Sequence, residues 1–266
     1  MFLACLAVGV GVTLVMLAAW VFQARVKNAG WVDVFWTFGT GLMCALTALM
    51  AGPVLWRRGL VAALLLIWCV RLGTHIARRV TGASEDVRYA RMRTVHGPKF
   101  QRHLLSFVLV QGPFSGALAI AVVCAARLPE QTFRAWDALG LMLAILAIGG
   151  ETLADRQMRR FRADPTNKGK ICDTGFWSIS RHPNYLFECL FWCAYPLLGL
   201  TIHNRWSLLS LLAPVLMYLT LRFASGVPPL EDAMLASRGD AYRQYQARTG
   251  AILPLLRCRR AKCASK

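Results

Sequence analysis

The stretch Phe2-Leu-Ala-Cys-Leu-Ala-Val-Gly-Val-Gly-Val-Thr-Leu-Val-Met-Leu-Ala-Ala-Trp-Val-Phe22 decides the fold class, because it contains no charged side chain. About 20 apolar residues in a helix are enough to cross roughly 30 Å of hydrocarbon. No basic segment precedes the run, and it has no clear cleavage site, so we expect a retained membrane helix and not a signal peptide.

Six further apolar runs follow, and together the seven predicted spans cover residues 2–22, 32–51, 59–77, 104–125, 136–155, 184–201 and 206–223. The composition agrees, because 56% of the 266 residues are hydrophobic and only 17% are charged. These values are not typical of a water-soluble surface. The sequence therefore predicts an all-α, multi-pass membrane protein that forms a single domain over 1–266, with a tail at 224–266.

The cations predict the orientation of the chain. One set of connections carries only Arg57, Arg58, Arg127, Arg134 and Arg205, and Arg71 and Arg222 lie within spans. The other 24 of the 31 Lys and Arg residues lie in the alternate connections and the C-terminal tail. By the positive-inside rule the N-terminus is outside and the C-terminus is cytoplasmic, which requires an odd number of spans.

The net charge of +18 raises the question of nucleic acid binding. The cations are confined to short segments between apolar runs and form no nucleic-acid motif, so we expect no such partner. The nine cysteines lie mostly in apolar runs, and none has zinc-ligand spacing. We expect neither a disulfide framework nor a metal site.

Ionisable groups inside spans are the first candidates for function, because burying them in a bilayer is costly. Asp33 lies at the cytoplasmic entry of the second span, where a solvated helix end is the alternative interpretation. Arg71, His75 and Arg79 recur every four residues and share one helix face. Such a stripe lines a cavity, unless both arginines only reach to the interface.

A second stripe ends the fifth span, where Glu151, Asp155, Arg159 and Arg162 also share one face. Salt bridges within the helix would explain it without a ligand. The segment that follows, Asn167 to Glu188, leads directly into the sixth span. Pro183 suits the first turn of a helix, so Arg181, His182 and Asn184 surround a helix N-terminus, which is a natural anion site.

Several of these stretches resemble the bacterial membrane proteins grouped with the steroid 5-alpha-reductases. The resemblance rests on Asp173-Thr-Gly-Phe-Trp-Ser-Ile-Ser-Arg-His-Pro-Asn-Tyr-Leu-Phe-Glu188, on Glu85-Asp-Val-Arg-Tyr-Ala-Arg-Met-Arg93, on Gly226-Val-Pro-Pro-Leu-Glu231 and on the closing stretch from Tyr242 to Pro254. It covers roughly residues 30 to 255, with the motifs in the same order.

The resemblance implies a reductase that binds NADPH from the cytoplasm and reduces a carbon–carbon double bond conjugated to a carbonyl in an apolar, steroid-like lipid. The cofactor-binding residues it implies are Arg78, Arg88, Arg162, Asn167, Lys168 and Arg181 on the phosphate side, Asp155, Asn184, Tyr185 and Glu188 around the nicotinamide and ribose, and His182 with Glu231 beside them. Glu151 stands where the reductases often carry an asparagine, which weakens it as a cofactor ligand.

In the steroid reductases an acid and a tyrosine flank the carbonyl, and the positions here that resemble them are Asp33 and His75. Either side chain could donate a hydrogen bond as enolate charge develops. An apolar cavity among the first four spans would take the lipid from the bilayer.

Two other functions remain open. The Arg-His-Pro-x-Tyr element also occurs in membrane methyltransferases that use S-adenosylmethionine and act on isoprenoid or phospholipid substrates. Alternatively, the protein binds lipid without catalysis, and its charged stripes only pack spans together. The excess of Arg over Lys points to a GC-rich bacterial genome and hence to an inner membrane. The oligomeric state is not indicated.

Overall fold

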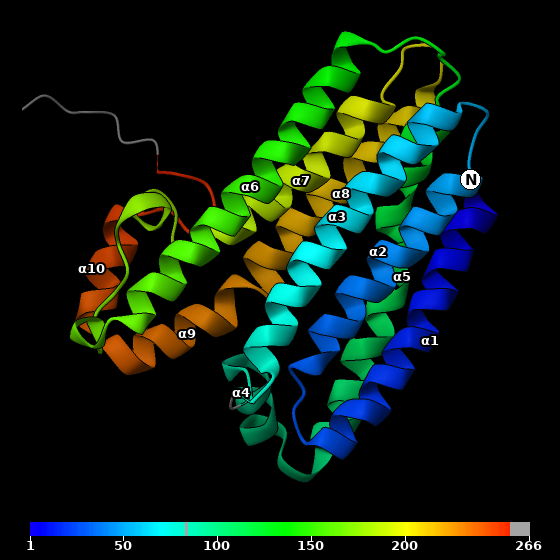
Figure 1. The fold of residues 1–266 in the computed structure, drawn as a ribbon. Helices are drawn as coiled ribbons and strands as arrows, with labels where there is room; N and C mark the ends of the chain where they lie inside the picture. The colour runs from blue at the N-terminus through cyan, green and yellow to red at the C-terminus, as the bar shows by residue number, and fades with distance from the viewer. Residues whose placement is uncertain (83–84, 256–266) are drawn as a thin grey trace, which may run out of the picture.

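The computed structural model describes residues 1–82 and 85–255, and this part of the chain is helical with one isolated bridge between Ser180 and Gly250. The long helices form a bundle, and α4, α9 and α10 lie at the end opposite the N-terminus (Figure 1). The helices are α1 (Phe2–Val26), α2 (Trp31–Met50), α3 (Leu55–Val80), α4 (Val87–His96), α5 (Phe100–Arg127), α6 (Ala135–Ala163), α7 (Pro183–Gly199), α8 (Leu212–Leu219), α9 (Val227–Arg238) and α10 (Asp240–Arg248).

Short 3-10 turns complete the bundle, and a π-helical turn, η5 (Thr220–Ala224), follows α8. The short turns are η1 (Gly97–Lys99), η2 (Pro165–Asn167), η3 (Gly175–Ser178) and η4 (Arg205–Leu211). The last predicted span, 206–223, therefore consists of η4, α8 and most of η5. The expected tail at 224–266 is folded where it is described, because it contains α9 and α10.

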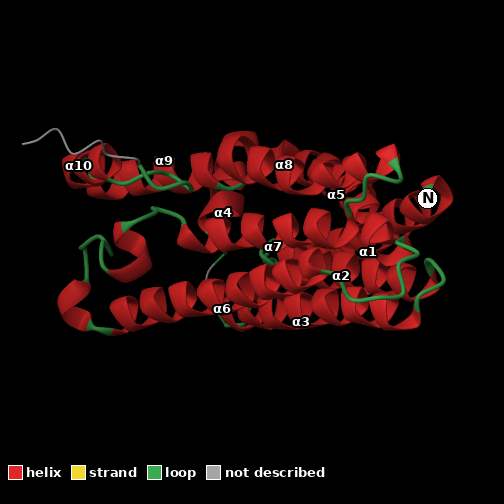
Figure 2. Cartoon of the chain, turned by 90° about the horizontal axis from the view of Figure 1, so that it is seen from above, coloured by secondary structure: helices red, strands yellow, loops and turns green. Residues whose placement is uncertain are grey.

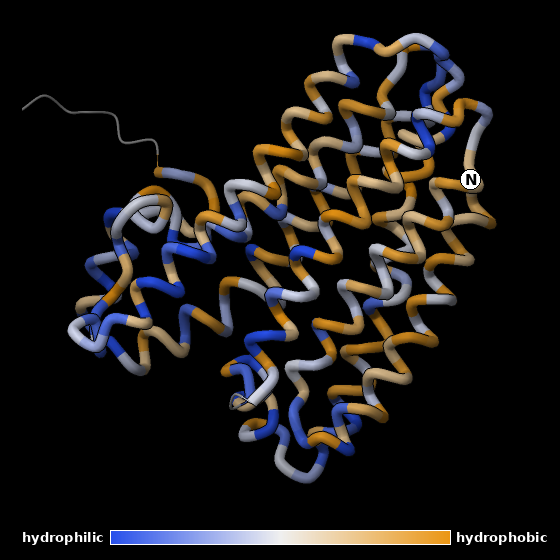
Figure 3. Tube along the Cα trace, viewed as in Figure 1, coloured by the Kyte–Doolittle hydropathy of each residue, from blue (hydrophilic) through white to orange (hydrophobic). Residues whose placement is uncertain are grey.

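All seven predicted apolar runs fall on helical segments. Within the described residues, six segments are long and apolar enough to cross a membrane: Phe2–Val26, Trp31–Met50, Leu55–Val80, Val87–Arg127, Ala135–Ala163 and Arg205–Arg238. The sixth predicted span corresponds to α7, which has 17 residues and so a length of about 26 Å. Apolar residues line the bundle, and polar ones gather at its ends (Figure 3). The chain is thus a multi-pass membrane protein.

Helices α1 and α5 approach closely through glycines. A Cβ on Gly112 would lie 1.9 Å from Thr13 Oγ1 and 2.7 Å from the Gly9 carbonyl oxygen, and a Cβ on Gly116 would lie 2.9 Å from the Cys5 carbonyl oxygen. Gly112 and Gly116 form a Gly-x-x-x-Gly pattern, which lets helix backbones approach and gain van der Waals contact in lipid. Small residues therefore fix the pairing of the first helix with the fifth.

Helices α3 and α6 run in the same direction, side by side along one face of the bundle (Figure 2). Three polar contacts join the two helices: Arg57 with Asp137, Arg71 with Thr152, and His75 with Arg159. The two partners of each contact are 80, 81 and 84 residues apart in the sequence, so the register is nearly constant. Two helices in parallel register need an odd number of crossings between them if both span the membrane. Helix α4 has 10 residues, a length of about 15 Å, and is too short to cross, whereas α5 has 28 residues, so α5 supplies that crossing.

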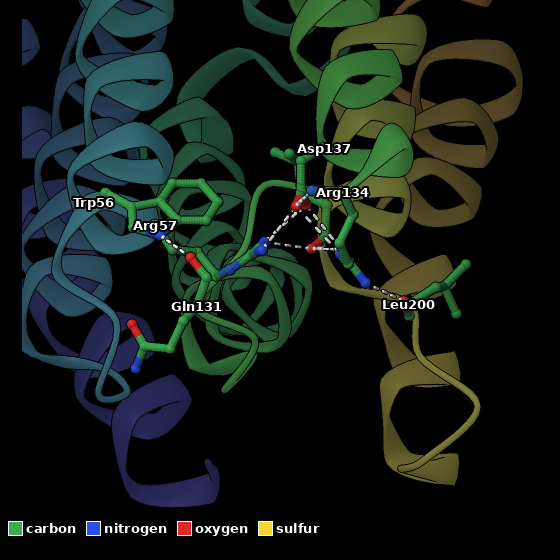
Figure 4. Close-up of polar contacts among 7 residues, drawn as sticks. Trp56, Arg57, Gln131, Arg134, Asp137 and Leu200 are labelled. Carbon is green, nitrogen blue, oxygen red and sulfur yellow. Dashed lines mark hydrogen bonds and ion pairs between the residues drawn. The ribbon is translucent and has the colours of Figure 1, made fainter.

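The start of α3 is held by a buried ion pair that the sequence analysis did not single out (Figure 4). Arg57 binds Asp137 through two hydrogen bonds of 2.8 Å, and neither side chain is exposed. Arg134 also binds Asp137, at 2.8 Å, and donates to the carbonyl oxygens of Leu198 and Leu200. The cluster therefore ties α3 and α6 to the end of α7.

Replacing Gly112 with alanine should destabilise the bundle, because the new methyl group overlaps Thr13 and the backbone of α1. We expect a loss of about 1–3 kcal/mol, the usual range for overpacking, seen as a lower midpoint of thermal unfolding in detergent by circular dichroism. Gly149→Ala in α6 is the matched control, because nothing lies within 4 Å of its Cβ position. Equal midpoints for the two variants would contradict the proposed close packing of α1 and α5.

Candidate functional site

The two predicted polar stripes face each other. Arg71 of α3 lies 2.7 Å from Glu151 and also binds Asp155, both on α6. His75 lies one turn further along α3, with Nε2 3.6 Å from Asp155 and Nδ1 3.4 Å from Arg159. The stripe on α6 is therefore not satisfied by bridges within its own helix. It pairs instead across the helix interface with Arg71 and His75 of α3.

The charge of the side chains at this interface changes from its deep end to its outer end. At the deep end, the buried carboxyl groups of Glu151 and Asp155 both contact the single guanidinium of Arg71. At the outer end, Arg162 lies within electrostatic range of Arg79, and it has no hydrogen bond or ion pair within residues 1–82 and 85–255. Arg79 itself pairs with Asp86 at 3.2 Å, and Asp86 also lies within electrostatic range of Arg162. Arg162, which has no direct partner among the described residues, is a cation at this end that is available to an anion.

Glu188 of α7 lies beside the deep end of the interface. Its two carboxylate oxygens accept hydrogen bonds of 2.9 Å, one from the indole of Trp68 and one from that of Trp192. The carboxyl group is buried and within electrostatic range of Glu151 and Arg71. Thus the structure brings Asp155 and Glu188, two of the predicted cofactor residues, into one cluster with Arg71 and Glu151.

Asp33 lies in a different set of contacts. It forms an ion pair with Arg88 and accepts a 2.7 Å hydrogen bond from the hydroxyl group of Tyr89. It shares no hydrogen bond with His75 in the described part of the chain. The predicted catalytic pair is therefore not joined directly, and Tyr89, which the sequence analysis did not single out, is the side chain that meets Asp33. Its position beside Arg88 in the Glu85–Arg93 motif was the available signal.

The loop before α4 anchors this cluster. Glu85 accepts hydrogen bonds from the backbone of Ala29 and from Arg93, and Asp86 binds Arg88 at 2.9 Å. Burial alone would raise the pKa of both carboxyl groups, but these hydrogen bonds and the neighbouring arginines hold each pKa below its usual value. Both acids therefore stay ionised at neutral pH and keep α4 next to Asp33.

Tyr185 connects the two regions. It lies on the first turn of α7, within electrostatic range of Arg88 and Asp33. Asn184, next to it, is partly buried, and its side chain makes no hydrogen bond with any described residue. A free amide next to Tyr185 in the chain leaves hydrogen-bonding capacity for a ligand at the start of α7.

Arg181, His182 and Glu231 form a cluster of their own. Arg181 binds Glu231 at 2.7 Å and donates to the carbonyl oxygens of Gln246 and Thr249, and His182 Nε2 lies 3.2 Å from the same carboxylate. Burial lowers the pKa of His182 more than Glu231 raises it, so its imidazole is neutral at pH 7. Because these groups satisfy one another, their visible role is to hold α9 and α10 against the start of α7.

The remaining predicted residues lie near the outer end. Asn167 donates to the Phe161 carbonyl oxygen at 3.1 Å and so closes the turn after α6. Arg78 and Lys168 are exposed, and each lacks an ion-pair partner among the residues that the structure describes. The arginines and lysine predicted to bind phosphate thus divide into paired ones (Arg88, Arg181) and free ones (Arg78, Arg162, Lys168).

The family to which the chain belongs follows from a match over most of its length. Residues 19–249 match the model of a family described as protein of unknown function (DUF1295). The chain belongs to this family. It is also 25% identical, over 279 aligned positions, to an uncharacterized protein (C594.04c) of Schizosaccharomyces pombe, in an alignment that covers 89% of this chain and 76% of the yeast protein. No solved structure matches.

Replacing Arg71 with methionine should strongly destabilise the protein, because Glu151 and Asp155 would lose their counter-charge inside the bundle. Removing one partner of a buried pair typically costs about 3–5 kcal/mol, which we expect to see as a lower unfolding midpoint. Arg78→Met is the matched control on the same helix and should change stability by less than about 0.5 kcal/mol. If Arg71→Met and Arg78→Met have the same unfolding midpoint, the α3–α6 ion pairs do not stabilise the fold.

Proposed function

We propose that the protein is a membrane-embedded reductase that uses NADPH to reduce a carbon–carbon double bond conjugated to a carbonyl in an apolar, steroid-like lipid. The observation that supports this most is the charge order along the α3–α6 interface. Carboxylates paired with Arg71 lie deep, and cations without carboxylate partners lie at the outer end. A long ligand with phosphates at one end and a neutral ring at the other fits that order.

The residues present fit NADPH in this way. Arg78, Arg162 and Lys168 are free to bind the phosphates, and Asn184 and Tyr185 would contact the ribose and nicotinamide, with Asp155 and Glu188 deeper. When bound, NADPH supplies the hydride. The other predicted cofactor residues act on the same site by holding its elements in position. The start of α7 is positioned by Arg181, His182 and Glu231, the turn after α6 by Asn167, and helix α4 by Arg88.

Asp33 and the groups around it would act on the substrate carbonyl, which needs a hydrogen-bond or proton donor as enolate charge develops. Both oxygens of Asp33 accept hydrogen bonds, so in this arrangement it orients Tyr89 and does not itself donate. An acid beside a tyrosine is the pair that the resemblance to the steroid reductases implies, and Asp33 with Tyr89 is such a pair. The one hydroxyl hydrogen of Tyr89 is donated to Asp33 in this structure, so Tyr89 would act as the donor by turning that hydrogen to the substrate carbonyl. His75, between Asp155 and Arg159, is then the alternative donor.

The membrane arrangement belongs to the same proposal. Seven spans, with α7 as the sixth, place the N-terminus outside and the end with α4, α9 and α10 in the cytoplasm of a bacterial inner membrane. NADPH would then reach the free cations directly from the cytoplasm, and the lipid would enter from the bilayer.

A methyltransferase that uses S-adenosylmethionine is the second candidate. The Arg181-His182-Pro183-Asn184-Tyr185 element favours it, because such enzymes carry a similar element. The free cations argue against it, because that cofactor has no phosphates. A lipid-binding protein without catalysis would use the same buried ion pairs only for packing.

Binding of NADPH to the detergent-purified protein should raise its unfolding temperature, whereas S-adenosylmethionine should not. We expect Arg162→Ala to weaken NADPH binding about tenfold, because one charge-assisted contact to phosphate is lost. Arg160→Ala, two residues away on another face of α6, should bind within about twofold of the wild type. Stabilisation by S-adenosylmethionine alone would replace the reductase with a methyltransferase.

Separate variants should distinguish the two candidate donors once an enone lipid substrate is found. Tyr89→Phe removes only a hydroxyl group and should lower kcat about 10²-fold or more while leaving NADPH binding intact. His75→Gln should then have the smaller effect on kcat. The reverse order would assign the donor to His75, and unchanged kcat in both variants would contradict the proposed site. NADPH oxidation, followed by absorbance, measures the rates.

A further inference from the structure

A cavity of about 560 Å³ lies at the end of the bundle opposite the site described above. Its walls come from the end of α5, the end of α7 and η4, and they are mainly apolar, with Val123, Leu128, Trp206 and Leu209 among them. Pockets that bind small molecules are typically of this size, apolar, and furnished with a few polar groups. The lining of this cavity also includes two charged residues, Arg127 and Glu130, which indicate the kind of ligand that it binds.

Two charged residues three positions apart stand at this cavity without partners. Oxygen Oε2 of Glu130 is buried and accepts no hydrogen bond from any described residue. Arg127 is exposed at the end of α5, and it likewise forms no ion pair or hydrogen bond in the ranges 1–82 and 85–255. Glu130 as a residue is half-buried and lines the cavity, so its carboxylate, which accepts no hydrogen bond within the described ranges, can take a donor from a ligand there.

From this arrangement we propose that the cavity binds one acyl chain of a zwitterionic phospholipid with a primary ammonium in its headgroup. The ammonium donates to Glu130 and the phosphate binds Arg127, so each free charge meets its opposite. The apolar walls take the chain. Exposed apolar residues beside the cavity, such as Ile202 and Leu208, place its mouth where lipid can reach it.

The site is separate from the proposed reductase and does not depend on it. Asn184 and Gly199, at the two ends of α7, are about 22 Å apart along the helix axis. A lipid headgroup beside Gly199 is therefore too far from Asn184 and Tyr185 to be a reacting group there. The bound lipid is a structural ligand that fills the space between α5, α7 and η4.

The test compares lipids that differ only in the headgroup. Wild-type protein in detergent is given phosphatidylethanolamine, phosphatidylcholine or phosphatidylglycerol with identical chains, and apparent dissociation constants are measured by native mass spectrometry. We expect phosphatidylethanolamine to bind about tenfold tighter than phosphatidylcholine, which corresponds to about 1.4 kcal/mol. The choline headgroup has no N–H to donate. Glycerophosphoethanolamine, which has no chains, should not compete.

Three variants and one control assign the binding to this cavity. Glu130→Ala should remove the preference for phosphatidylethanolamine, and Arg127→Ala should weaken binding of all three phospholipids. The control is Arg25→Ala at the other end of the bundle, which should change nothing, because Arg25 is exposed and has no ion-pair partner among the described residues. Leu209→Trp fills the cavity and should abolish retention of every lipid.

Any of three results would overturn the proposal, two of them from the comparison of phosphatidylethanolamine with phosphatidylcholine. One is equal affinity of the wild type for phosphatidylethanolamine and phosphatidylcholine, and the other is a preference that survives Glu130→Ala. Tighter binding of phosphatidylglycerol would show an anionic-lipid site at Arg127 and would also overturn it. Because NADPH is absent from every arm, these outcomes are independent of the reductase.

Discussion

The ion pairs between α3 and α6 are the constraint on which the rest of the structure depends. A charge inside a bilayer-spanning bundle must find its partner within the protein, because lipid cannot solvate it. Arg57 with Asp137 fixes one end of the helix pair, and Arg71 with Glu151 and Asp155 fixes the other half. Two fixed points set both the register and the rotation of the helices, so the remaining polar side chains must face each other.

The arginines named above therefore have two different roles. Arg57, Arg71, Arg134 and Arg181 are engaged by carboxylates or carbonyl oxygens and hold helices in place. Arg78 and Arg162 have no such partners in the described part of the chain. The four engaged side chains are at most 18% exposed, and the two free ones lie at the outer end. Other arginines form ion pairs at the surface, such as Arg91 with Asp232. A high net charge is thus compatible with a tightly satisfied interior.

The sequence was a good guide to local features and a poor one to pairings. Apolar runs located every long helix, because hydropathy over 20 residues reports burial in lipid directly. The four-residue spacing of Arg71, His75 and Arg79 predicted one shared stripe, of which Arg71 and His75 contact α6, whereas Arg79 is half-exposed and pairs with Asp86. Arg57 and Arg134 gave no such signal, since each stands at a helix end and looks like a topology determinant. Their shared partner, Asp137, lies 80 residues from Arg57.

The same limit explains the catalytic candidates. Asp33 stood out because a carboxylate near a span is unusual, but Tyr89 lies on a short polar helix where a tyrosine draws no attention. Only the folded chain, with the Glu85–Asp86 loop bound to Ala29 and Arg88, brings the two together. Which polar residues meet is decided by loops that connect helices, and hydropathy carries no information about them.

The close packing of α1 on α5 has a consequence for biogenesis. During synthesis α1 emerges first, yet the surface that its Gly9 region needs does not exist until more than 100 residues have followed. The glycine face of α1 must therefore wait in the bilayer beside α2 alone, covered by lipid or by an insertion factor. The bundle can assemble around α1 only after α5 is complete. A chain that stops or inserts wrongly before Gly116 leaves α1 without α5, and membrane quality control can recognise the exposed glycine face.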